Sequence, residues 1–150
     1  MTTARRFARE AHHGRGTRFR LYPQPPVLEA IHGAETVWIA HPPRFISPGP
    51  ADNRMYVVDA VGKDRHYEFP FLPPWRGASN PPVRPGPDGH FDQLAPGSRE
   101  FMAAHMYGTL RFVLDVWEGY FGGPIPWHFA ADYPRVELVP LVEWNNAHSG

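Results

Sequence analysis

The sequence predicts an α+β fold: a small β-rich N-terminal half with a long proline-rich loop, followed by one long amphipathic helix and an edge strand. Short β-branched and aromatic runs indicate the strands, and apolar residues spaced by three and four indicate the helix. With 150 residues, 42% of them hydrophobic, the chain can bury one core. We therefore expect residues 1–150 to form a single domain or domain fragment: a flexible arm (1–26), strands and loop (27–97), and the helix with its edge strand (98–150).

The elements of the first half follow from local composition. Residues 1–26 are polar and end in several prolines, which is typical of an arm without regular structure. Residues 36–40 form a β-branched and aromatic run that predicts a short strand. The runs 55–61 and 65–69 flank a Gly-Lys-Asp segment, which favours a hairpin. Prolines recur through residues 70–97, so neither a helix nor a central strand can persist there, and a loop this long suggests function or packing against another part.

A long helix is the element with the strongest local signals. Ser98 is a suitable N-cap, and Glu100 places a negative charge in the first turn, where the helix dipole favours it. Gly122 and Gly123, followed by proline, predict the end of the helix. The residues expected on its apolar face are Met102, Met106, Leu110, Val113, Trp117 and Phe121.

A strand is expected after the helix, at residues 136–142. Pro140 lies within this run and has no amide hydrogen, so the strand is expected at the edge of a sheet. An edge strand has unpaired backbone groups, and these can bind an extended peptide as an additional strand.

Candidate catalytic and metal-binding groups give no complete motif. The chain has nine histidines, but none has a zinc ligand at the i+4 spacing on a helix. We expect His105 to be a partly buried imidazole bonded to a backbone carbonyl, with a catalytic role as the alternative. Asp115 and Glu118 are three residues apart and could pair for acid–base chemistry, but on a polar helix face we favour solvated side chains. No catalytic or metal-binding residue is therefore assigned.

Charge and composition exclude several classes of partner. Fifteen basic residues balance fifteen acidic ones, so we expect neither nucleic acid nor a membrane surface as a partner. The chain has no cysteine, which excludes disulfides and thiolate metal sites. No apolar run has the length of a membrane span, and no signal peptide is apparent, which weakly favours a cytoplasmic location.

Two segments resemble thermolysin-like zinc metallopeptidases. Residues 104–108 read Ala-His-Met-Tyr-Gly, and residues 144–147 read Trp-Asn-Asn-Ala. Their order and spacing are similar to a family in which a helix beginning Ala-His-x-Tyr leads to an edge strand ending aromatic-Asn-Asn-Ala. The resemblance covers residues 98–150. It implies that Asn146 and Ala147 bind the substrate, the first through its side chain and the second through its backbone, and that a peptide or protein is the substrate.

The same resemblance also concerns the zinc-binding motif of the family. The family holds a zinc ion with a His-Glu-x-x-His helix, a motif that does not occur in this sequence, so zinc is implied only for a complete homologous domain. We therefore expect the N-terminal, substrate-edge portion of such a peptidase, inactive by itself. The alternative is a non-enzymatic interaction domain that uses the edge strand and the proline-rich loop, for which Pro82–Pro85 would fit a polyproline-binding partner. A small histidine-based metalloenzyme is a third hypothesis.

Overall fold

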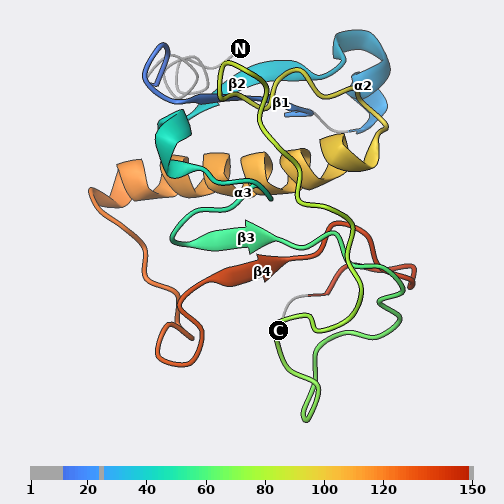
Figure 1. Cartoon of the computed structure of the whole chain (residues 1–150). Coiled ribbons are helices and arrows are strands. Elements are labelled where there is room, and N and C mark those ends of the chain that lie inside the picture. The colour runs from blue at the N-terminus through green and yellow to red at the C-terminus, as the bar shows by residue number, and fades with distance from the viewer. Residues whose placement is uncertain (1–11, 24–25, 149–150) are drawn as a thin grey trace.

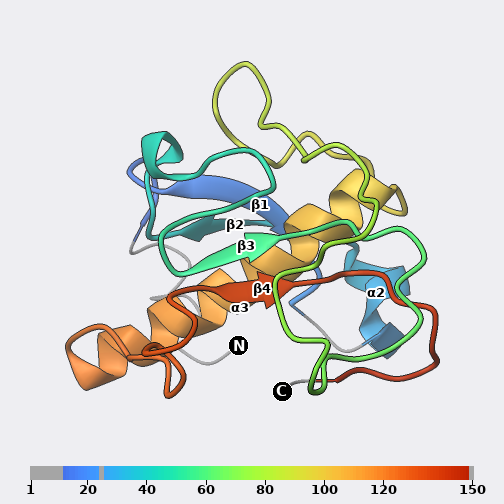
Figure 2. The ribbon, with the colours of Figure 1, turned by 60° about the horizontal axis from the view of Figure 1, so that its bottom comes forward.

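One long helix, α3 (Arg99–Phe121), lies between two small sheets in the computed structural model, which describes residues 12–23 and 26–148 (Figure 1). Strands β1 (Thr17–Leu21) and β2 (Glu35–Ile39) form an antiparallel sheet on one side of the helix. Strands β3 (Met55–Val57) and β4 (Val136–Leu138) form a parallel sheet, which is drawn below the helix in Figure 1 and in front of it in Figure 2. The predicted α+β class is confirmed.

The sheet of β1 and β2 corrects the prediction for the N-terminal segment. The expected strand at 36–40 is confirmed as β2, but its partner β1 lies within the predicted arm. The arm is therefore wrong for residues 17–21, while residues 1–11 lie outside the described part of the chain. β1 alternates strictly, because Thr17, Phe19 and Leu21 are buried and the two arginines between them are half-buried. The arginines made this strand resemble a solvated segment.

The sheet of β3 and β4 replaces the predicted hairpin. β3 forms at the start of the expected run 55–61, but residues 65–69 form no strand. β3 instead pairs in parallel with β4, so that Met55 lies opposite Val136 and Val57 opposite Leu138. This pairing buries Met55 and Leu138 against α3, an advantage that no pattern within residues 55–69 could reveal.

The ends of α3 agree with the prediction, but its buried face does not. The Ser98 side chain accepts a hydrogen bond from the Phe101 amide, and Gly122 closes the helix in the left-handed conformation with φ 73°. Of the six residues expected on the apolar face, Met106 and Leu110 pack against the core, while the other four are exposed. The buried face is made instead by Phe101, Ala103, Ala104, Tyr107, Gly108, Arg111 and Leu114.

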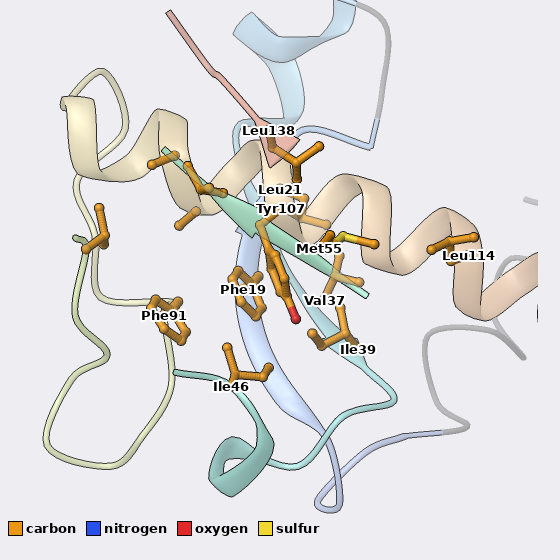
Figure 3. Close-up of a cluster of buried hydrophobic side chains, with 14 residues drawn as sticks. Phe19, Leu21, Val37, Ile39, Ile46, Met55, Phe91, Tyr107, Leu114 and Leu138 are labelled. Atoms are coloured by element: carbon orange, nitrogen blue, oxygen red, sulfur yellow. The ribbon is translucent and has the colours of Figure 1, made fainter. Parts of the chain in front are cut away.

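The core lies mainly between α3 and the two sheets (Figure 3). Phe19 of β1 stacks on Phe91, with 5.0 Å between ring centroids, and also contacts Tyr107 of α3. Met55 and Leu138, from the sheet of β3 and β4, belong to the same buried cluster. Phe91 belongs to the proline-rich segment, which therefore contributes to the core.

The proline-rich loop is packed on the fold. Val83 is buried, and its carbonyl accepts a hydrogen bond from the Gly49 amide. The Pro82–Pro85 segment is thus partly used within the fold, which disfavours it as a polyproline ligand. A short helix that the sequence analysis did not predict, α2 (Pro26–His32), connects β1 to β2, and a 3-10 turn, η1 (Pro43–Phe45), follows β2. Among the described residues, no helix combines the length and the apolarity that a membrane span requires.

Candidate functional site

The open side of β4 is the first part of the candidate site. β4 has β3 as its one strand neighbour among the described residues. The Val136 amide and the Leu138 carbonyl bond to the segment that contains β3. Because successive backbone groups of a strand point to opposite sides, the amides of Glu137 and Val139 face away from β3. The predicted edge position is confirmed, although the regular strand ends at Leu138 rather than at residue 142.

The side chain of Glu137 lies at the centre of a polar and aromatic cluster beside this strand. Its carboxylate accepts hydrogen bonds from the Tyr56 hydroxyl (2.8 Å), the Trp75 amide (3.0 Å) and the Tyr67 hydroxyl. Burial, and then the adjacent carboxylate, raise the pKa of both phenols, so each keeps its proton and remains a donor. Glu137 thereby ties β4 to the loop that follows β3.

Lys63, the one lysine of the chain, lies in the same cluster. Its side chain is buried, and its ammonium donates to the Arg65 carbonyl (2.9 Å). The Nζ atom lies 3.6 Å from the centre of the Tyr67 ring and 5.0 Å from that of Trp75, which are cation–π distances. Burial lowers the pKa of Lys63, while Glu137 opposes this effect. Sequence reasoning missed Glu137 because its partners are distant in the chain, and missed Lys63 because no local pattern predicts its burial.

Two pockets adjoin the cluster, and both include Lys63. The smaller one, of about 430 Å³, will be called the C-terminal pocket, because the chain after β4 forms one of its walls. Its lining includes Ala60, Val61, Gly62, Leu141, Val142 and Glu143. The larger one, of about 690 Å³, will be called the proline-loop pocket. Its lining includes Arg65, Tyr67, Phe71, Leu72, Trp75, Arg76 and Tyr133.

Asn146 and Ala147, the substrate-binding residues that the resemblance implies, lie beyond both pockets' linings. Both are exposed, and neither lies in a strand: Asn146 ends a bend eight residues after β4, and Ala147 follows it. The Ala147 amide donates to the Asn146 side-chain oxygen (2.8 Å). The two groups that would hold a peptide therefore satisfy each other here, and a bound peptide would have to replace this bond.

Asp115 and Glu118 are not the solvated side chains that we favoured. Both accept from the buried guanidinium of Arg111, at 3.0 Å and 2.8 Å from Nη2. Arg54 pairs with Glu118 (3.0 Å), and Asp52 lies 3.8 Å from Arg111. Removing one partner of a buried pair leaves an uncompensated charge, which costs about 3–5 kcal/mol. Neither pocket includes these residues, so we assign the cluster to holding α3 in place.

The histidines form no recognisable metal centre in the described part of the chain. There, no group of three or more His, Asp or Glu side chains is placed to hold a metal ion. His105 is half-buried, as expected, and its Nε2 atom accepts from the Tyr22 amide (3.1 Å), while the predicted bond to a backbone carbonyl stays a prediction. An accepting Nε2 is the neutral, unprotonated nitrogen, so His105 links α3 to the end of β1.

No protein-family model, curated protein or solved structure matches this chain. Its function is therefore inferred from the open edge of β4 and the groups around it.

Proposed function

We propose that this chain is the peptide-binding, substrate-edge portion of a thermolysin-like zinc peptidase, and that the peptide pairs with the open edge of β4. The observation that carries the proposal is that β4 has one strand neighbour within the described part of the chain. An unpaired edge binds an extended peptide by main-chain hydrogen bonds, with side chains setting register. The chain supplies binding groups, while peptide hydrolysis would need a zinc-binding helix that these residues do not contain.

The direction of β4 supports this placement. After Leu138 the chain continues beside the loop that follows β3, and the Glu143 amide donates to the Lys63 carbonyl (2.9 Å). This contact guides the chain toward Asn146 and Ala147. A peptide on the open edge would extend along β4, and the Asn146 side chain would fix its far end after it had given up its bond to the Ala147 amide.

Hydrogen exchange tests the pairing directly. The probe is the blocked peptide acetyl-Thr-Val-Thr-Val-Thr-amide, and amide exchange is followed by NMR. We expect the peptide to protect the amides of Glu137 and Val139, because they face away from β3, without changing the protection of Leu138. The same peptide N-methylated at every residue has no amide hydrogen to donate on either edge and is the control. Equal protection by both peptides, or none by either, would contradict the proposal.

Asn146 gives a matched pair of variants with its exposed neighbour Asn145. Asn146→Ala should weaken binding of the blocked peptide about fivefold, the equivalent of one hydrogen bond of about 1 kcal/mol. Asn145→Ala should leave the affinity unchanged. Titration calorimetry measures both. If the two variants bind alike, the substrate role implied for Asn146 is wrong, whatever the result at β4.

The alternative, a non-enzymatic interaction domain, would use the same edge of β4. The coding sequence downstream of this chain distinguishes the two proposals. The peptidase proposal expects a His-Glu-x-x-His motif in the reading frame after Gly150, because zinc-assisted hydrolysis needs those ligands and that general base. A reading frame without the motif would favour the interaction domain instead.

A further inference from the structure

The proline-loop pocket has an apolar wall that the fold leaves uncovered. Phe71 and Leu72 line the pocket but remain 59% and 44% exposed. Trp75 and Tyr133 complete this wall, and both are half-buried. The Trp75 ring is held in place, because its Nε1 donates to the Ala78 carbonyl (2.9 Å) and its amide binds Glu137. The wall is therefore a fixed aromatic surface, which suits an apolar group.

Among the described residues, the charges around this wall leave one cation without a hydrogen bond or an ion pair. Lys63 is balanced electrostatically by Glu137, which lies behind the wall. Arg65 pairs with Asp64 (3.6 Å), and its guanidinium lies over the Phe71 ring, 5.5 Å from the ring centre. Arg76 is exposed at the pocket and has neither a hydrogen bond nor an ion pair within the described residues. The pocket thus combines apolar surface with one unpaired guanidinium.

We propose that the proline-loop pocket is a second binding site, which takes an apolar group bearing a carboxylate, the chemistry of the C-terminal residue of a peptide. The apolar side chain packs on Phe71, Leu72 and Trp75, while the carboxylate pairs with Arg76. A guanidinium binds a carboxylate through two parallel hydrogen bonds. A doubly charged phosphate fits less well, since a single unpaired cation faces it and Asp64 is close. This site is separate from the open edge of β4.

The carboxylate is tested with a pair of small ligands. The probes are N-acetyl-phenylalanine and its amide, titrated by calorimetry at low ionic strength. We expect the acid to bind and the amide to bind about three- to tenfold more weakly, in line with a solvent-exposed charge-assisted contact. Neither probe can form a strand on β4. If neither probe binds, the proposal that a peptide pairs with β4 is unaffected. If no peptide pairs with β4, the proposal for this pocket is likewise unaffected.

Matched variants test the residues. Arg76→Gln should remove the preference for the acid, whereas Arg84→Gln, another exposed arginine outside both pockets, should preserve it. Leu72→Ser should weaken both ligands several-fold, whereas Val113→Ser, which is equally exposed on α3 at 45%, should not. Equal affinity for acid and amide, equal effects within either pair of variants, or no binding at millimolar ligand would overturn the proposal. Melting curves confirm that each variant is folded.

Discussion

Gly108 shows how one residue sets the distance between α3 and β1. A methyl group added there would lie 2.9 Å from Leu21 Cδ2 and 2.9 Å from Phe19 Cδ1. Both of these side chains are fully buried and cannot move aside. The absence of a side chain at residue 108 therefore lets the helix approach the strand, and this is the physical reason for a glycine in the middle of a long helix.

The contrast between Gly108 and Gly119 gives a prediction for stability. Gly119 lies in the same helix, and a methyl group there would contact nothing within 4 Å. Gly119→Ala should raise the free energy of unfolding by about 0.5–1 kcal/mol through helix propensity. Gly108→Ala should lower it by about 1–3 kcal/mol, because overpacking outweighs that gain. Urea denaturation measures both, and a stabilised Gly108→Ala variant would show that the packing is looser than described.

At the scale of elements, α3 is capped as its sequence predicts but buries a different face. The apolar stripe read from the sequence is mostly exposed, and its C-terminal part carries stacked aromatic rings. Trp117 lies 6.1 Å from Phe121 and 6.2 Å from Tyr120, between ring centroids. The buried face contains Arg111 instead. Hydrophobic periodicity counts arginine as polar, so it cannot predict a helix face buried through ion pairs.

The exposed stripe of α3 predicts binding of a hydrophobic dye by the folded chain. Replacing Trp117 and Phe121 together by glutamine should remove most of the dye fluorescence at low temperature, because a contiguous aromatic patch binds such dyes. The control replaces Val27 and Ile31 of α2, which are 79% and 72% exposed but aliphatic. An equal loss of fluorescence in the control would mean that the stripe is not a distinct surface.

At the scale of the whole molecule, one buried and two half-buried tyrosines connect distant parts of the chain to carboxylates. Tyr107 of α3 donates to Asp52 (2.8 Å), and Tyr56 and Tyr67 donate to Glu137. Burial raises the pKa of Tyr107 well above its usual value, and the Asp52 carboxylate adds to this effect. All three phenols thus keep their protons in the folded chain to a higher pH than in the unfolded chain.

This difference predicts a loss of stability at alkaline pH. Above about pH 10 the unfolded chain releases the three tyrosine protons while the folded chain retains them, so the free energy of unfolding falls as pH rises. The lowered pKa of Lys63 acts in the opposite direction, but it is one group against three. Urea midpoints measured at increasing pH should show the decline. Tyr107→Phe should reduce the slope of the free energy of unfolding against pH by the equivalent of about one proton. The control is Tyr120→Phe, since Tyr120 is exposed. An unchanged slope in Tyr107→Phe would contradict this account.

The sequence by itself determined the α+β class, the position of β2, both ends of α3 and the edge position of β4, because each depends on residues close together in the chain. Ser98 and Gly122 act through local backbone geometry, and Pro140 through its missing amide hydrogen. The substrate role of Asn146 and Ala147 stays a prediction.

Tertiary structure decided the pairing of β3 with β4, the burial of Arg111 and the cluster around Lys63 and Glu137. In each of these the favourable free energy comes from partners brought together by folding, and no local pattern encodes it.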